Sequence, residues 1–66
     1  MKEYTYAELE LYENYFFVYD GVVYYGQAVK LDWDEENKPT HFTVIMSYEN
    51  DKEICNIWDA TLIYQL

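Results

Sequence analysis

The stretch that decides the fold is NYFFVYDGVVYYGQAVKL, residues 14–31. Its first six residues are aromatic and β-branched, which favours a strand with apolar side chains on both faces. Asp20-Gly21 follows and is the strongest short signal for a two-residue hairpin turn. The residues after the turn form a second expected strand, in which Gly26 indicates a bulge or a sharp bend. The sequence therefore predicts a β-hairpin at the centre of the protein.

Three more strands are predicted after this hairpin. An acidic loop, residues 32–40, leads into HFTVIMSY (41–48), which alternates apolar and polar side chains. After a turn, EICNIW (53–58) and TLIYQL (61–66) complete a five-stranded antiparallel meander. The alternation assigns one face of the third strand to Phe42, Val44, Met46 and Tyr48.

The segment before the hairpin is predicted to be a short helix. Thr5 and Glu8 have the spacing of a capping box, so the helix is expected from about Tyr6 to Glu13. The alternative is an irregular edge strand, but the alternation of apolar residues breaks at Ala7 and favours the helix. One domain, residues 1–66, is expected because a chain of this length cannot build two cores.

Five short strands must curl to protect their edges and enclose a core. We therefore expect a mainly β fold, either a five-stranded antiparallel curled sheet or a small barrel, with the short N-terminal helix. The order of strands over residues 22–66 resembles that of small SH3-like and Tudor-like barrels.

The composition limits how so small a protein can be stabilised. A single cysteine, Cys55, rules out an internal disulfide, and a single histidine, His41, rules out the common structural zinc sites. Aromatic residues make up 21% of the chain and favour dense packing and self-association. We expect no cofactor, and a homodimer is consistent with this composition.

The charge indicates the kind of partner. Thirteen acids against four lysines give a net charge of −9, which disfavours direct binding to nucleic acid or to an anionic membrane. A basic protein is the natural complement, although the charge could serve solubility alone. Polar residues follow Met1-Lys2 at once, and no apolar run approaches membrane-spanning length. A cytoplasmic location is therefore expected.

Metal binding and catalysis are weakly supported. Asp32 and Asp34 could share a hard cation, but the loop lacks the glycine and further ligands of a calcium loop, so a solvated acidic loop is preferred. A pair formed by His41 and Cys55 can be imagined. Cys55 falls within a predicted strand, where a buried structural thiol is usual, and the chain has no arginine. We expect neither a metal site nor an enzyme.

Two kinds of binding surface remain. One is an aromatic cage for a methylated ammonium group, built from Tyr24, Tyr25, Trp33, Tyr48 and Trp58. The pattern alone favours the other interpretation, in which these rings form the core and its rim.

The other is an acidic face. Alternate residues of a strand lie ~6.7 Å apart, about twice the ~3.4 Å phosphate step of one DNA strand, so Asp32 with Asp34 could imitate phosphates. The predicted helix would put Glu10 and Glu13 on one face. The candidate partner-binding residues are Glu10, Glu13, Asp32, Trp33, Asp34, Glu35, Glu36, Glu49 and Asp51.

The stretch NKPTHFTVIMSYENDKE, residues 37–53, is similar to part of the phage uracil-DNA glycosylase inhibitors. The shared features are an Asn-Lys-Pro loop, an alternating apolar strand and a tyrosine before an acidic turn. The resemblance implies an acidic edge that imitates phosphate and an apolar pocket that captures a side chain of the enzyme. Residues 8–11, ELEL, are the nearest counterpart of that edge, and the helix predicted there conflicts with the role.

These observations favour a non-enzymatic phage-type inhibitor that binds a nucleic-acid enzyme by DNA mimicry. Uracil-DNA glycosylase, CRISPR and restriction enzymes are examples of such targets, since small, acidic, tyrosine-rich proteins are typical of phage-encoded inhibitors. The alternative is an SH3-like or Tudor-like adaptor that binds a basic or methylated peptide through an aromatic face. A homo-oligomeric structural protein is the third possibility.

Overall fold

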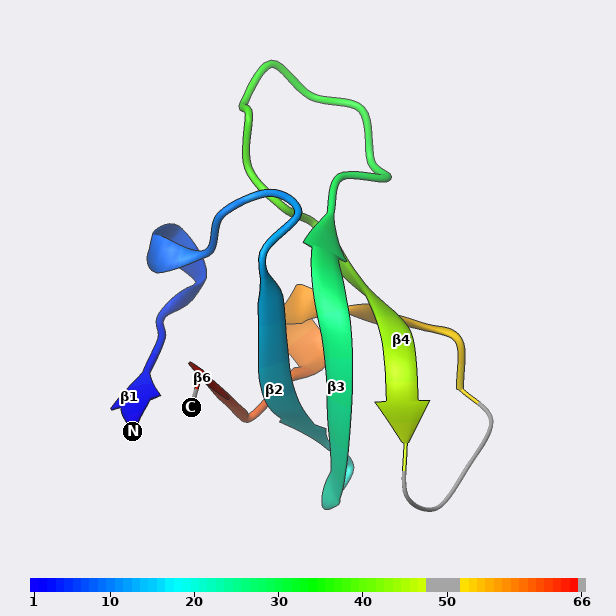
Figure 1. The fold of residues 1–66 in the computed structure, drawn as a ribbon. Helices are drawn as coiled ribbons and strands as arrows, with labels where there is room; N and C mark the ends of the chain where they lie inside the picture. Colours follow the sequence, from blue (N-terminus) through cyan, green and yellow to red (C-terminus); the bar gives the residue numbers. More distant parts are fainter. Residues whose placement is uncertain (48–51, 66) are drawn as a thin grey trace.

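The computed structural model describes residues 1–47 and 52–65 as a single antiparallel sheet with two short 3-10 turns (Figure 1). The strand order is β1-β6-β2-β3-β4-β5. The elements are β1 (Lys2–Glu3), η1 (Tyr6–Glu8), β2 (Asn14–Tyr19), β3 (Val22–Val29), β4 (His41–Ser47), β5 (Ile54–Asn56), η2 (Ile57–Asp59) and β6 (Leu62–Gln65).

The expected mainly β, antiparallel fold is confirmed, but the predicted strand number, the meander order and the N-terminal helix are wrong, and of the two expected forms the described residues build the open sheet. The sheet has six strands because Lys2 and Glu3 pair with the end of β6. It is not closed into a barrel, because β1 and β5 form its two edges in the described part of the chain. The meander also stops at β5: the last strand returns to pair with β2, where Phe16 lies opposite Tyr64.

The predicted helix over residues 6–13 is also wrong. Only one 3-10 turn, Tyr6–Glu8, forms. The capping contact is present, since the Glu8 carboxylate accepts hydrogen bonds from the Thr5 backbone N–H at 2.9 Å and from its hydroxyl at 3.1 Å. The chain then becomes extended at Leu9, whose side chain is fully buried. Burial of this leucine outweighs the weak preference of so short a segment for helix.

The central hairpin forms as predicted. Asp20 and Gly21 have positive φ angles of 50° and 77°, and Tyr19 pairs with Val22 across the turn. Positive φ at both central residues is the geometry that matches the twist of a two-residue hairpin. The hairpin therefore fixes the register of β2 and β3.

The predicted irregularity at Gly26 is confirmed. The register between β3 and β4 shifts there, because Tyr25 pairs with Met46 whereas Gly26 pairs with Val44. A Cβ atom on Gly26 would lie 2.2 Å from the Thr43 carbonyl oxygen, so only glycine fits. The extra residue on β4, Ile45, also overturns part of the predicted alternation: Met46 lies on the opposite face from Phe42.

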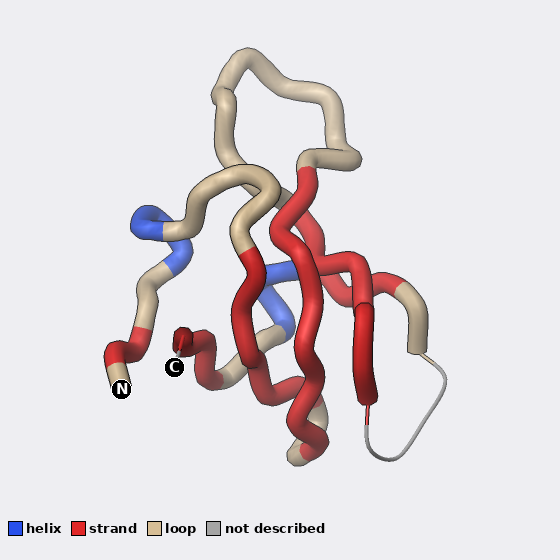
Figure 2. Tube along the Cα trace, in the orientation of Figure 1, coloured by secondary structure: helices blue, strands red, loops and turns tan. Residues whose placement is uncertain are grey.

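The core lies between the inner face of the sheet and the segment that follows β5. In Figures 1 and 2 this segment passes behind β2 and β3 as η2 before the chain reaches β6. The Asn56 side chain starts the turn by accepting a hydrogen bond from the Trp58 N–H at 3.0 Å, which ends the strand predicted over residues 53–58. The buried core contains Leu9, Tyr15, Phe17, Tyr24, Ala28, Phe42, Cys55, Ile57, Ala60 and Ile63.

Candidate partner-binding site

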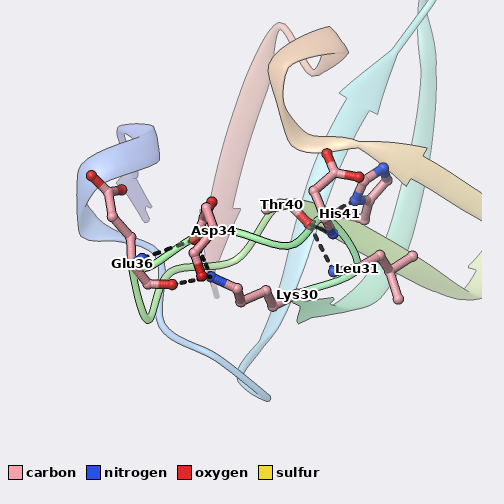
Figure 3. A network of polar contacts seen from close by, with 7 residues as sticks. Lys30, Leu31, Asp34, Glu36, Thr40 and His41 are labelled. Carbon is pink, nitrogen blue, oxygen red and sulfur yellow. Dashed lines mark hydrogen bonds and ion pairs between the residues drawn. The ribbon is translucent and has the colours of Figure 1, made fainter.

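The acidic loop between β3 and β4 projects beyond one end of the sheet (Figure 1). Lys30 organises it: its ammonium group donates to the Asp34 carboxylate and to the Glu36 carbonyl oxygen (Figure 3). The same carboxylate accepts the Glu36 N–H at 2.9 Å. The hydrogen bond from Lys30 holds the pKa of Asp34 below its usual value. Asp34 is therefore an internal contact of the loop.

Thr40 anchors the two ends of the loop to each other. Its side-chain oxygen accepts the backbone N–H of Leu31 at 2.9 Å and that of Asp32 at 3.3 Å. It also lies 2.7 Å from Nδ1 of His41, as Figure 3 shows. Thr40 itself is only 8% exposed, and its bonds tie the start of the loop to the residue that precedes β4.

The loop directs one aromatic ring and several carboxylates outward. Trp33 is 89% exposed. In residues 1–47 and 52–65, no hydrogen bond or ion pair engages the carboxylates of Asp32, Glu35 and Glu36, and all three residues are exposed. Exposed and unpaired carboxylates remain available to cations of a partner.

Glu10 and Glu13 lie in the turn before β2, at the same end of the sheet as the loop (Figure 1). Their predicted placement on one helix face is wrong, because Tyr12 between them adopts a positive φ of 69°. The backbone instead holds them: the Glu13 carbonyl oxygen accepts the Ala28 N–H at 2.9 Å, and the Glu10 N–H donates to the Tyr15 hydroxyl at 3.0 Å.

The structure thus brings seven of the nine predicted binding residues to one end of the sheet. We call this the acidic end: Glu10, Glu13, Asp32, Trp33, Asp34, Glu35 and Glu36. Lys38 joins the acidic loop to η1 by donating to the Ala7 carbonyl oxygen at 3.2 Å. The other two predicted residues, Glu49 and Asp51, lie outside the described residues.

An apolar hollow of about 480 Å³ lies beside the acidic end. Tyr6 and Trp58 meet edge to face in it, with ring centroids 4.6 Å apart. The Tyr6 hydroxyl donates to the Ala60 carbonyl oxygen at 3.1 Å, which holds η1 against the segment after η2. The hollow is lined by Thr5, Tyr6, Ala7, Glu36, Lys38, Pro39, Ile57 and Trp58.

The sequence does not predict this pair, because its patterns place Tyr6 in a helix and Trp58 in a strand. The signal for Trp58 was Asn56, a residue that favours a tight turn two positions before it. No local signal joins residue 6 to residue 58, because the contact depends on the return of the chain behind the sheet.

The predicted aromatic cage does not assemble among the described residues. Tyr24 is 1% exposed and belongs to the core, whereas Tyr25 lies on the outer face of β3. Trp33 is on the loop, and Tyr48 lies outside the described residues. Of the four predicted rings that the structure describes, Trp58 alone borders the apolar hollow.

The residues considered for catalysis and metal binding sit in ordinary structural surroundings. Cys55 is 2% exposed, and burial raises the pKa of its thiol, which opposes formation of the reactive thiolate. Within the described ranges, no group of three or more His, Cys, Asp or Glu side chains is arranged to hold a metal ion. No helix in that part of the chain has the length and apolar character needed to span a membrane.

Comparison with known proteins adds no relative. The chain matches no protein-family model, no curated protein and no solved structure at a significant level. The function is therefore inferred from the surfaces of this molecule.

Proposed function

We propose that the protein is a non-enzymatic inhibitor that binds a basic, DNA-binding enzyme through the acidic end. One observation supports this above the others: two separate loops rich in acidic residues lie at the same end of the sheet, and one of them carries an exposed tryptophan. Carboxylates steer a cationic partner and speed association, while an aromatic anchor supplies the contact area that charge lacks.

The contacts inside the loop separate two roles among the acids. Asp34 is engaged by Lys30 and maintains the shape of the loop. Glu35 and Glu36 have unengaged carboxylates in the described structure and are the acids proposed to meet the partner's lysine and arginine side chains. Phosphate mimicry requires a loop of fixed conformation. The hydrogen bonds of Lys30 and Thr40 hold the loop in this way.

The test is capture of the partner followed by competition. The immobilised protein is exposed to a bacterial lysate, and bound proteins are identified by mass spectrometry. We expect a DNA-binding enzyme among the captured proteins. Duplex DNA and salt should each release this enzyme from the immobilised protein, and the free protein should inhibit its activity. Glu35→Lys should abolish capture, whereas Asp20→Lys, the same charge change at the exposed turn at the other end of β2, should not. Retention of the complex under saturating DNA would overturn the proposal.

A second candidate function follows from the hollow of Tyr6 and Trp58. An aromatic pair beside carboxylates favours an adaptor that binds a basic or methylated peptide. Calorimetry with a trimethyl-lysine peptide distinguishes the two functions. The adaptor requires binding that Trp58→Ala abolishes and Trp33→Ala leaves intact. For the inhibitor, Trp33→Ala should abolish binding to the enzyme, and Trp58→Ala should leave that binding intact.

A further inference from the structure

The outer face of the sheet carries an apolar ladder that crosses four strands. Tyr64 on β6 pairs with Phe16 on β2, Phe16 with Tyr25 on β3, and Tyr25 with Met46 on β4. Residues paired across an antiparallel sheet share a face. This face lies on the side of β2 and β3 away from η2 (Figure 1).

A second apolar row runs beside the first, because Val18 pairs with both Leu62 and Val23. Neither row contains a charged residue over these strands, in a chain of net charge −9. Glu3 on the edge strand β1 lies opposite Tyr64 and borders the ladder. We call these two rows the outer ladder: Phe16, Val18, Val23, Tyr25, Met46, Leu62 and Tyr64.

The rings of the outer ladder are already ordered. Phe16 stacks on Tyr64 with centroids 5.4 Å apart and planes 11° apart, and it meets Tyr25 at 4.7 Å. Side chains held by neighbours lose little further freedom when a surface is covered. At the β4 end of the ladder, Met46 is 55% exposed and the adjacent Ile45 is 58% exposed. Contiguous exposed apolar surface of this kind marks an association site.

We infer that the outer ladder is the contact between two copies of this chain. The distribution of charge favours a second copy of the chain as the partner at this surface. Strongly acidic molecules repel one another wherever carboxylates meet, and the outer ladder lets two copies meet through uncharged side chains while the acidic ends stay apart. A domain of 66 residues also buries a small core, and self-association covers apolar surface that it cannot bury alone.

The size of the surface sets the expected strength. Four strands spaced ~4.8 Å apart give a narrow contact, at the small end of interfaces, which bury less than ~1,200 Å² in total. A dimer that dissociates at micromolar concentration is therefore expected. Two copies of charge −9 repel, so screening by salt should strengthen the dimer. This salt dependence is opposite in sign to that of the proposed complex with a basic enzyme.

The inference is tested by sedimentation equilibrium of the full chain at about 0.05 M and about 0.5 M sodium chloride, over which screening increases several-fold. A monomer–dimer equilibrium is expected, with a dissociation constant that falls at the higher salt concentration. A monomer at every concentration would overturn the inference, as would an equilibrium that weakens with salt.

A matched pair of variants locates the contact. Met46 and Leu31 are each 55% exposed, one on the outer ladder and the other in the acidic loop, and Met46→Lys and Leu31→Lys change the charge identically. Met46→Lys should raise the dissociation constant at least about tenfold, and Leu31→Lys should not. Equal effects would overturn the inference. Glu35→Lys distinguishes the surfaces: it should remove enzyme capture and leave the dimer intact, so either proposal can fail alone.

Discussion

On the inner face of β2 and β3, Tyr15, Phe17 and Tyr24 are at most 2% exposed, whereas on the outer face Phe16 and Tyr25 are only partly covered. The residue types on the two faces are nearly the same. The difference comes from what lies over them: Leu9, Ile57 and Ala60 cover the inner rings. Aromatic content therefore predicts that a strand forms, and the later course of the chain decides which side becomes core.

The largest effect on stability is expected from a pair of phenylalanine substitutions that compares the two faces. Phe17→Ala removes a fully buried ring and should lower the free energy of unfolding by about 4 kcal/mol. Phe16→Ala, one residue away, should lower it by only about 1 kcal/mol because its ring is partly exposed. Urea unfolding followed by circular dichroism measures both values. Phe17→Leu, at about 1 kcal/mol, keeps the comparison measurable if the alanine variant does not fold. Equal losses for the two alanine variants would contradict the assignment of faces.

The second test concerns Gly26, where the register between β3 and β4 shifts. Gly26→Ala would bring a methyl group against the Thr43 carbonyl oxygen and the Phe17 ring, which should cost about 2 kcal/mol or more. Gly21→Ala is the control: it has free space around it but a φ of 77°, so strain of about 1 kcal/mol is expected. Thermal unfolding of the two variants gives the order. A larger loss for Gly21→Ala would contradict the close approach of the Thr43 carbonyl oxygen to Gly26.

The third test concerns the acidic loop between β3 and β4. Thr40→Val removes the acceptor of the Leu31 and Asp32 N–H groups and should cost about 1–2 kcal/mol. Amide hydrogen exchange at Leu31 should accelerate. Thr61→Val serves as control, since Thr61 is exposed and its hydroxyl makes one long bond of 3.4 Å to Val18. Unchanged exchange at Leu31 would show that Thr40 does not hold the loop.

The smallest effect is expected at η1, away from both faces. Hydrogen bonds from Thr5, together with Lys2 at 3.0 Å, lower the pKa of Glu8 from 4.5 to about 2. A carboxyl with a lowered pKa stabilises the fold above its unfolded pKa, so this contribution should be present above pH 4.5 and lost as pH falls through about 2.

Nuclear magnetic resonance titration of the Glu8 carboxyl checks the lowered pKa directly. Glu8→Gln should flatten the fall in stability between those two pH values, and Glu10→Gln should leave it unchanged. A Glu8 that titrates near its ordinary value would contradict the capping contact.

Local chemistry explains which parts of the fold could be predicted. Asp20-Gly21 specifies its turn through backbone geometry, and Gly26 specifies the register shift because no side chain fits there. Both signals act within a few residues. The pairing of Lys2 with Gln65 and the return of β6 to β2 depend on contacts across most of the chain, which local patterns do not encode.

The candidate site divides in the same way. The acidic loop could be found from composition, because its charge is concentrated in consecutive residues. Two things could not: that Lys30 engages Asp34, and that Tyr6 meets Trp58. The Lys30–Asp34 contact depends on the conformation of the loop, and the Tyr6–Trp58 contact depends on the path of the chain behind the sheet. Each contact changes which residues should be substituted.

The two tryptophans give the molecule separate optical reporters. Trp33 is 89% exposed on the acidic loop, and Trp58 is 60% exposed and packed on Tyr6 at the hollow. Trp33→Phe leaves a protein whose emission comes from Trp58 alone, and Trp58→Phe leaves Trp33 alone. A partner at the loop should change the emission of one single-tryptophan protein, and a peptide in the hollow that of the other. Each surface can therefore be followed in solution without an attached dye.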